Sequence, residues 1–466
     1  MSGSGGSPGS VAVIGGGLAG ITAALRCADA GRNVTLFEAR PWLGGLTHSF
    51  KRGELDVDNG QHVFLRCCTA YRAFLDRLGV SDKVHLQPRL DIPIRSPLRA
   101  EPARLRRNGL PAPLHLGGAL MRYSMLSPAQ RLRFIRAALA LRRVDRTAPA
   151  VDEQSFGGWL REKGQDALTV SALWDLVGVA TLNATADQAS LALAAMVFQV
   201  GLLTDAGAAD IGWSLVPLRQ LHGEPARHRL AEAGADVRTG TKIDSIEPRG
   251  DRWLIGTGGE EHMADQVVLA VEPRVAERLL PSGSVPLPAG WSARLGSSPI
   301  INVHVVLDRR VMSGPFVAGV STPIQWVFDR TEHSGMADRL RAEGSGATNP
   351  DGQYLAVSLS AADDMIDMPV AALREKLMPQ LEALLPEVRS AKVLDFFVSR
   401  ERHATFRPAP GSGALRPGAV TASPGLFLAG AWTDTGWPAT MESAVRSGEA
   451  AATAALAHRM SEGVPA

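Results

Sequence analysis

Three glycines and one acidic residue near the start of the chain have the types and spacing that suit a dinucleotide. Gly15, Gly17 and Gly20 form the pattern Gly-x-Gly-x-x-Gly, and Glu38 follows them. In such a pattern the first glycine turns the chain, the second lets the backbone approach a pyrophosphate, and the third lets a helix lie close to a strand. Glu38 stands where an acid accepts hydrogen bonds from ribose hydroxyls. We therefore expect a phosphate-binding turn at a helix N-terminus.

The elements that must position these residues can be predicted from the surrounding sequence. An apolar run at residues 11–14 predicts a buried strand, residues 21–30 a helix, and residues 34–37 a second strand. A glycine-rich turn with its strand, helix and acid is much more specific than the glycines alone. The pattern does not by itself distinguish NAD from FAD.

A second glycine pair favours FAD. Gly44 and Gly45 follow Glu38 closely, and the pair resembles the glycine extension of flavoproteins in the amine oxidase and carotenoid desaturase superfamily. In those proteins the extended FAD needs backbone clearance beyond the pyrophosphate. The resemblance therefore implies FAD as the cofactor.

Longer strings make the resemblance more specific. These strings are DNGQH at 58–62, LWDLVGVATLN at 173–183, SPIINVHVVLD at 298–308, QWVFDR at 325–330, RERHATF at 400–406 and AWTDTGWPATMESAVRSG at 431–448. They are similar to the squalene-associated FAD-dependent desaturases, a family now interpreted as hydroxysqualene dehydroxylases, and the similarity runs over nearly the whole chain.

The resemblance implies an α/β fold: a Rossmann-like FAD-binding domain of the amine oxidase type, with an inserted α+β substrate domain and a helical cap. We expect the FAD-binding domain to be discontinuous, formed by residues 11–87, 225–298 and 407–466. Residues 88–224 and 299–406 then form the substrate domain and cap. Strands are expected at 235–238, 242–247, 266–271, 299–307, 324–328 and 353–359, and helices at 71–78, 225–233 and 365–385.

The last strand and helix of the chain form the second strong signal. Residues 426–429 predict a buried strand, and Pro438 and Thr440 open a helix with Glu442 in its first turn, where an acid suits the helix dipole. A helix N-terminus aimed at the isoalloxazine would place the Met441 N–H near flavin O2 and stabilise the negative charge of the reduced ring.

Taken together, the motifs and the resemblance assign a set of cofactor-binding residues. They are Gly15, Gly17, Gly20, Glu38, Ala39, Arg40, Gly44, Gly45, Gly60, Gln61, His62, Ile243, Gly430, Ala431, Asp434, Ala439, Thr440 and Met441. The chain departs from the family at Ala431, where an aspartate is usual, and at Leu46, where an arginine is usual. We expect Asp434 or water to replace the missing acid.

The reaction implied is transfer of hydride from reduced FAD to the carbon of hydroxysqualene that loses its hydroxyl. This reaction needs an apolar tunnel for the substrate, a proton donor for the leaving hydroxyl, and the exclusion of water. His62, Asp434 and His403 are the candidate acids, and His62 has an ordinary pKa that suits proton donation near neutrality. For His62, a hydrogen bond to FAD or to a strand carbonyl is favoured over catalysis, whereas Asp434 is equally compatible with cofactor binding and catalysis. Trp174, Trp326 and Trp437 are candidates to line the tunnel, with a role as core aromatics at least as favoured.

Other functions remain open at this point. A desaturase or amine oxidase would use the same FAD in the oxidative direction, and a flavin-binding carrier or chaperone would bind terpenoid without turnover. The chain has no second Gly-x-Gly-x-x-Gly unit, because Gly256, Gly258 and Gly259 lack a flanking strand and helix of the right kind. We therefore expect NADPH to act as an external donor, either visiting the flavin transiently or feeding a separate reductase.

Composition excludes several classes of protein. The net charge is +2, so no nucleic-acid partner is expected. Cys27, Cys67 and Cys68 lack metal spacing, so no metal is expected; the adjacent pair is predicted to be reduced thiols on a helix of a cytoplasmic protein. Residues 1–10 are expected to be a disordered tail and not a secretion signal. Residues 188–204 are too short and too interrupted to span a bilayer, which favours a buried or pocket-lining helix.

The section from 88 to 146 mixes many arginines with leucines, alanines and prolines. One interpretation is a solvated helical cap. The other is an amphipathic surface that meets anionic lipid on the inner face of the plasma membrane, with the basic face opposite Leu120, Met121, Leu126, Leu132, Phe134 and Leu139. A hydrophobic triterpenoid substrate and upstream squalene-pathway enzymes are the partners that the resemblance implies.

Overall fold

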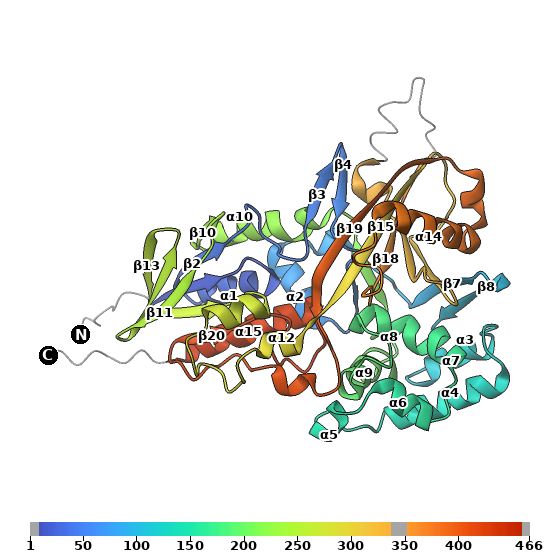
Figure 1. Cartoon of the computed structure of the whole chain (residues 1–466), viewed down its shortest axis with the longest axis horizontal. Helices are drawn as coiled ribbons and strands as arrows, with labels where there is room; N and C mark the ends of the chain where they lie inside the picture. The colour runs from blue at the N-terminus through green and yellow to red at the C-terminus, as the bar shows by residue number, and fades with distance from the viewer. Residues whose placement is uncertain (1–8, 337–351, 459–466) are drawn as a thin grey trace.

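Five parallel strands form the sheet that carries the glycine-rich turn (Figure 1). The computed structural model describes residues 9–336 and 352–458, so most of the predicted tail at 1–10 lies outside the described residues. The strand order is β10-β2-β1-β14-β20. The bounds are β1 (Ser10–Ile14), β2 (Asn33–Glu38), β10 (Asp236–Thr239), β14 (Gln266–Leu269) and β20 (Leu426–Leu428).

Two helices from opposite ends of the chain pack together on this sheet. α1 (Leu18–Asp29) follows β1 and lies against α15 (Met441–Ala457). The predicted strand-helix-strand unit is confirmed, although α1 begins three residues earlier than predicted, directly after the glycine at its N-cap. A Cβ added at Gly448 would lie 2.2 Å from the Ala19 carbonyl oxygen, so a glycine in α15 allows this close helix contact.

A small antiparallel sheet and a helix flank the nucleotide sheet. The sheet consists of β11 (Ser245–Arg249), β12 (Arg252–Thr257) and β13 (Glu260–Ala264), and α10 (Glu224–Glu232) leads into β10. The predicted strand at 242–247 begins later, at Ser245, because residues 240–244 instead form a loop beside the end of β2.

A seven-stranded sheet forms the second layer, in the order β19-β15-β18-β17-β16-β7-β8. Its strands are β7 (Asp91–Ser96), β8 (Arg99–Arg106), β15 (Ser297–Leu307), β16 (Phe316–Gly319), β17 (Trp326–Asp329), β18 (Gln353–Leu359) and β19 (Val393–Phe406). α14 (Val370–Leu384) covers one face through its leucines. β15, β17, β18 and α14 were expected from the sequence.

The first part of the section 88–146 is not helical, which corrects the prediction of a helical cap there. β7 and β8 form a hairpin at the edge of the seven-stranded sheet. Ile92 and Ile94 of β7 and Ala103 and Leu105 of β8 are buried, whereas residues between them face outward. This alternation with a period of two is the pattern of a half-buried strand.

The remainder of that section and the residues that follow it, as far as Leu203, form the helical cap. The cap consists of α3 (Gly117–Met121), α4 (Pro128–Leu141), α5 (Pro149–Asp152), α6 (Phe156–Glu162), α7 (Ala167–Thr169), η3 (Val170–Trp174), α8 (Asp175–Leu182), α9 (Leu191–Phe198) and η4 (Gln199–Leu203). Residues 188–204 are thus mostly helical and largely buried, as predicted. Within the described ranges no helix is long and apolar enough to cross a bilayer.

Short elements connect the two sheets. β3 (Ser49–Arg52) pairs with β4 (Leu55–Asp58), and β9 (Ile211–Ser214) lies between β5 (Val63–Leu65) and β6 (Val84–Leu86). α2 (Thr69–Leu78) follows β5. The two adjacent cysteines are free thiols, but they precede α2 instead of lying on it, because Cys68 is the N-cap residue. The remaining turns and helices are η1 (Ser81–Lys83), η2 (Leu114–Leu116), η5 (Arg219–Gly223), α11 (Pro273–Leu279), α12 (Trp291–Leu295), η6 (Glu332–Ser334), η7 (Pro386–Ser390) and η8 (Ser412–Leu415).

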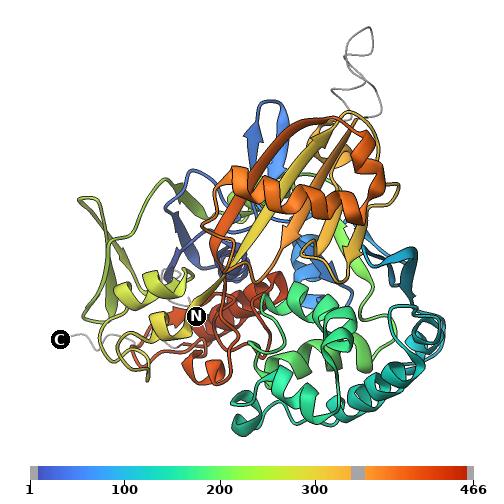
Figure 2. The same ribbon diagram turned by 45° about the vertical axis from the view of Figure 1, so that its right-hand side comes forward.

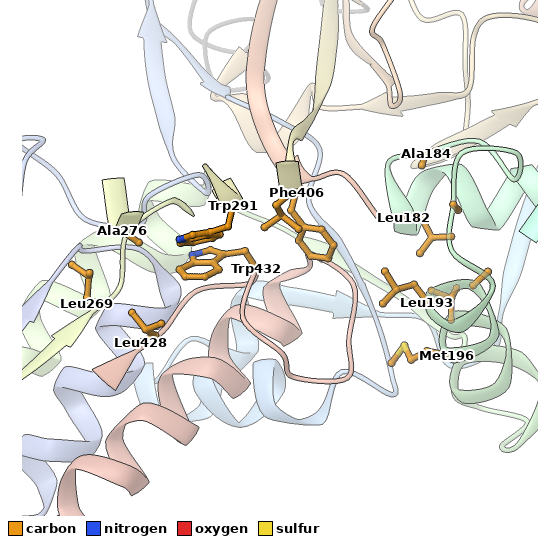
Figure 3. Packing of buried hydrophobic residues seen from close by; sticks show 14 of the residues in the cluster. Leu182, Ala184, Leu193, Met196, Leu269, Ala276, Trp291, Phe406, Leu428 and Trp432 are labelled. Carbon is orange, nitrogen blue, oxygen red and sulfur yellow. The ribbon is translucent and has the colours of Figure 1, made fainter. Parts of the chain in front are cut away.

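One hydrophobic core runs from the nucleotide sheet to the cap (Figure 3). Trp291 of α12 stacks on Trp432, which follows β20, with ring centroids 5.2 Å apart. Phe406, at the end of β19, lies between this pair and Leu193 of the cap. The core therefore fixes the cap relative to the nucleotide-binding loops.

Candidate active site

The first glycine-rich turn is shaped by backbone contacts. Gly15 has φ of +109°, and a Cβ at Gly20 would lie 1.8 Å from the Gly15 carbonyl oxygen. Gly17 differs, because the nearest atom to a Cβ there would be Gly45 Cα at 3.8 Å. Gly17 also caps α1 without a side-chain hydrogen bond, which leaves the helix N-terminus open to an anion.

Glu38 ends β2 and faces this turn. Its Oε2 accepts a hydrogen bond from Gly16 N at 2.6 Å, and its Oε1 accepts one from Arg40 N at 2.8 Å. Thr241 N donates to the Glu38 carbonyl oxygen, which brings the loop that precedes Ile243 beside the acid. Glu38 thus lies beside the phosphate-binding turn, where the ribose acceptor was predicted.

The second glycine pair packs directly on the first turn. Gly44 N donates to the Gly16 carbonyl oxygen at 2.8 Å, and a Cβ on Gly45 would lie 2.8 Å from Gly17 Cα. Gly44 and Gly45 also have positive φ, at +112° and +58°. The glycine pair therefore allows two backbone loops to pack against each other. This role is additional to the predicted one, which was to leave space for the cofactor.

The N-terminus of α15 presents open amides. Thr440 is the N-cap, and its Oγ1 accepts a hydrogen bond from Ser443 N. The first bond of the helix joins Ala444 N to the Thr440 carbonyl oxygen, so the N–H groups of Met441 and Glu442 precede it. Gly430, Ala431 and Ala439 lie in the loop before this helix, and Ser443 Oγ donates to the Ala431 carbonyl oxygen.

Glu442 lies in the first turn of α15, as predicted, and it also binds a second helix. Its side chain is buried and accepts hydrogen bonds from Ala70 N at 3.2 Å and Tyr71 N at 2.7 Å, at the N-terminus of α2. Arg446 Nε also donates to it at 2.7 Å. The acid therefore caps a neighbouring helix and ties α2 to α15.

The segment from Asp58 to His62 packs against the seven-stranded sheet, where Asn302 of β15 and Ser399 of β19 donate hydrogen bonds to the Asn59 carbonyl oxygen. Asp58 is buried against Arg330. His62 faces a small cavity lined also by Gln61, Trp213, Phe328 and Arg330. The Gln61 amide nitrogen is buried without a hydrogen-bond partner among the described residues, which leaves a donor available to a ligand.

The pKa of His62 is lower than the ordinary histidine value on which the prediction relied. Burial lowers the pKa below 6.5, and this effect is partly offset by a hydrogen bond between its Nδ1 and the Gly60 carbonyl oxygen at 3.1 Å and by the charges of Asp58 and Glu401. Burial thus favours the neutral imidazole, whereas the nearby carboxylates favour its protonated form.

Glu401 is a site residue that the sequence interpretation missed. It lies on β19, and its Oε1 accepts a hydrogen bond from Asn59 Nδ2 at 2.9 Å. Asn59 Nδ2 also donates to the Leu46 carbonyl oxygen, and Asn59 Oδ1 accepts from His48 N. Burial lowers the pKa of His48, and Glu401 opposes this shift as it does for His62. The RERHATF string contained Glu401, but only the fold brings it to the DNGQH segment.

The other two candidate acids lie outside this cluster. Asp434 is exposed in the turn before α15, where its Oδ1 accepts a hydrogen bond from Gly436 N at 3.2 Å. His403 is exposed, and its ring nitrogens lie 2.8 Å from Ser297 Oγ and 3.4 Å from an Arg274 nitrogen. The structure thus groups His62 with Glu401 and His48 and not with His403.

The three tryptophans differ in environment. Trp174 is 1% exposed, donates to Gln165 Oε1, and packs against Phe134. Trp326 and Trp437 are half-buried, and Arg446 lies 5.0 Å from the Trp437 ring centroid. Trp174 therefore belongs to the aromatic core of the cap, and a tunnel role for the other two stays a prediction.

These features fit an extended flavin dinucleotide. The two glycine loops and Glu38 would hold its pyrophosphate and ribose, and the α15 amides and Gln61 would meet its polar ring edge. Leu46 and Val63, beside the loops, are 44% and 36% exposed, which leaves apolar surface for a bound group to cover. Among the described residues no cluster of three or more His, Cys, Asp or Glu side chains is arranged to hold a metal.

Comparisons with known proteins find similarity over nearly the full chain. A model of the family described as flavin containing amine oxidoreductase matches residues 18–456. The hydroxysqualene dehydroxylase of Rhodopseudomonas palustris is 31% identical over 457 residues, covering 96% of this chain and 98% of that protein. The protein of the same name from Sinorhizobium fredii is 28% identical, with 96% and 99% covered.

More distant relatives carry other names. The 15-cis-phytoene desaturase of Solanum lycopersicum is 24% identical over 460 residues, covering 95% of this chain and 77% of that protein. Among solved structures, putrescine oxidase bound to putrescine has a TM-score of 0.69 at 19% identity, with 97% and 99% of the two chains covered. This likeness confirms the predicted fold class.

Proposed function

Because the chain belongs to the family of flavin containing amine oxidoreductases and is an FAD-dependent oxidoreductase, we propose that it catalyses the reductive dehydroxylation of hydroxysqualene to squalene in triterpene, or hopanoid, biosynthesis. The observation that carries the proposal is the full-length similarity to hydroxysqualene dehydroxylases. Enzymes that make the hydroxylated triterpenoid would act upstream.

In the proposed reaction the C–O bond of the substrate breaks, a hydride replaces the hydroxyl group, and a proton converts the departing group to water. Reduced FAD, when bound, supplies the hydride. The residues of this chain must then bind the substrate, exclude water and deliver the proton. Exclusion of water matters because water captures a developing carbocation.

We assign proton delivery to His62, with Glu401 as a positioning residue. The His62 side chain lines a small cavity together with Gln61, and the Glu401 carboxylate acts electrostatically on both His62 and His48. A negative charge near an imidazole favours the protonated form that a general acid needs. This pairing supports His62 over the exposed His403 and Asp434, which stay as alternatives to be tested.

The electron donor is part of the same proposal. We propose NADPH as the external reductant, either visiting the flavin transiently or feeding a separate reductase. Stopped-flow mixing of the anaerobic holoenzyme with NADPH should bleach the flavin absorbance if reduction is direct. Bleaching by dithionite alone would mean that a reductase is required.

The deciding experiment is anaerobic incubation of the reduced holoenzyme with hydroxysqualene, followed by extraction and mass spectrometry. Squalene formed in proportion to flavin reoxidised is the expected result. Binding of hydroxysqualene with no change in the flavin redox state would contradict the proposal and favour a carrier.

A second candidate function is an oxidative desaturation, favoured by the similarity to 15-cis-phytoene desaturase. The same flavin would then be reduced by a polyene substrate and reoxidised by dioxygen or a quinone. Incubating the oxidised holoenzyme with phytoene tests this. A desaturated product together with no squalene from hydroxysqualene would replace the first proposal with the second.

A further inference from the structure

The section from residue 88 to 146 carries a strong local excess of positive charge. It contains thirteen arginines and no lysine, against only three acidic residues, in a chain whose total net charge is +2. The rest of the molecule is therefore acidic overall. Such a segregated arginine cluster attracts a negatively charged surface.

Helix α4 presents arginine and leucine on one exposed stripe. Leu132, Arg136 and Leu139 are spaced by four and three residues, which places them on the same side of a helix. Leu132 is 50% and Leu139 is 42% exposed. Ala137 and Leu141 occupy the opposite side and are buried. The predicted separation of a basic face from an opposing apolar face is therefore wrong, because the two residue types share the outer face.

Further apolar side chains are exposed on the elements next to α4. Leu98, in the turn between β7 and β8, is 74% exposed, and Leu114 and Met121 near α3 are 60% and 66% exposed. In both views α3, α4 and the β7–β8 hairpin lie along the same edge of the molecule (Figures 1 and 2). Exposed apolar side chains gathered at one edge are unusual on a soluble surface without a partner.

Not every arginine of the section is free. Arg104 and Arg107 bind Asp91 and Asp210, so they hold the hairpin in place. Arg136, Arg142 and Arg143 are exposed and have no acidic partner among the described residues. Their charges are thus available to an external anion.

A cavity of about 660 Å³ opens at the end of α4. It is lined by residues 144–147, by Gln199, and by Arg66 and Thr69, of which Thr69 begins α2. Thr69 is within hydrogen-bond distance of Arg446 on α15, at 3.4 Å. The cavity therefore lies between the end of α4 and the start of α2, a helix that contacts α15.

We propose that this edge, the cap face formed by Leu98, Leu114, Met121, Leu132, Arg136, Leu139, Arg142 and Arg143, docks on an anionic phospholipid bilayer. The arginines bind lipid phosphates, and the leucines and methionine enter the interfacial layer. Docking leaves the mouth of the cavity at the lipid surface. This second consequence rests on the proposed function, since it concerns an apolar substrate, whereas docking itself does not.

Vesicle flotation of the flavin-loaded full chain tests the docking. With vesicles of phosphatidylglycerol and phosphatidylcholine at low salt, the protein should float, and the bound fraction should fall with added NaCl because salt screens the arginines. Vesicles of phosphatidylcholine alone should bind at least roughly tenfold less protein. Equal binding to both vesicle types, or no binding to the anionic ones, would overturn the proposal.

Matched variants test whether vesicle binding depends on the cap face or only on the net charge of the protein. Arg136→Glu, Arg142→Glu and Arg143→Glu combined should reduce binding to anionic vesicles by at least roughly tenfold, whereas Arg227→Glu, Arg249→Glu and Arg294→Glu, on the nucleotide-binding part, should leave it within about twofold. Leu132→Ser with Leu139→Ser should weaken binding while keeping its salt dependence. Flavin content and the melting temperature verify that each variant folds.

The same variants exclude another polyanion as the target. If the protein binds RNA through Arg136, Arg142 and Arg143 but does not bind anionic vesicles, the cap face recognises nucleic acid and the proposal is wrong. Equal loss of vesicle binding in the cap-face and control variants would also contradict it, because the effect would then follow net charge alone.

Discussion

The Asp58 carboxylate accepts a hydrogen bond from Arg330 Nη2 at 2.7 Å, and the two side chains are only 4% and 8% exposed. The pair joins the DNGQH segment to the end of β17. Asp58 also accepts hydrogen bonds from Ser49 Oγ and Leu218 N, and Arg330 donates to the Ser214 carbonyl oxygen. This buried pair therefore fixes the segment that bears Gln61 and His62.

Replacing one partner of this pair should be costly. Arg330→Met leaves the Asp58 carboxylate buried without its counter-ion, so we expect the free energy of unfolding to fall by about 3–5 kcal/mol. Denaturant titration followed by circular dichroism measures the change. Asp58→Asn combined with Arg330→Met should recover part of the loss, because the uncompensated charge is removed.

An exposed ion pair provides the control. Arg402 pairs with Asp367, and their side chains are 56% and 79% exposed. Arg402→Met should change the free energy of unfolding by no more than about 1 kcal/mol. Similar losses for Arg330→Met and Arg402→Met would show that burial of the Asp58 pair is unimportant.

Gly17→Val should remove flavin without unfolding the protein. A Cβ at this position meets no protein atom nearer than Gly45 Cα at 3.8 Å, whereas a bound pyrophosphate needs the same space. We expect colourless protein with a near-native circular dichroism spectrum and FAD affinity lowered by roughly a hundredfold or more. FAD titration of the apoprotein measures this.

Gly20→Val is the contrasting variant. Its Cβ would lie 1.8 Å from the Gly15 carbonyl oxygen, so we expect it to disturb folding as well as flavin binding. If Gly17→Val instead retained full flavin content, the cofactor would not pass over this turn.

Local sequence patterns predicted the nucleotide-binding strands and helix because strand, turn and helix are contiguous there. The β7–β8 hairpin was missed because arginines and prolines obscured the alternation of Ile92, Ile94, Ala103 and Leu105. The partners of Glu442 and Glu401 could not be predicted at all. Each contacts a segment more than three hundred residues away in sequence, and single-sequence periodicity contains no information on such pairs.

His304 should make the protein sensitive to acid. It is completely buried between Tyr354 OH, 2.7 Å away, and Ser399 Oγ, 3.0 Å away, and burial lowers its pKa from 6.5 to about 3. Because the folded-state pKa is depressed, this contribution to stability is complete above pH 6.5 and is lost as pH falls toward 3. At pH 5 the loss amounts to about 2 kcal/mol.

The slope of stability against pH isolates this residue. His304→Gln should reduce the slope between pH 6 and pH 4 by about 1.4 kcal/mol per pH unit, whatever its effect at neutral pH. His85→Gln is the control, since His85 is exposed and has no acidic partner among the described residues, and the slope of this variant should stay close to that of the unaltered protein. An unchanged slope for His304→Gln would mean that His304 is already protonated in the folded state or is hydrated there.

The pH dependence of squalene formation should identify the acid and its positioning residue. His62→Ala should keep its flavin yet lose roughly a hundredfold or more in kcat, the usual scale of general acid catalysis. Glu401→Gln removes a charge that favours protonated His62, so the alkaline limb of the rate profile should move to lower pH with a smaller loss of kcat. A purely structural role for Glu401 would lower the rate equally at every pH. Asp434→Asn and His403→Ala, at exposed positions, should leave the profile in place, and a loss confined to Asp434→Asn would transfer the acid to that residue.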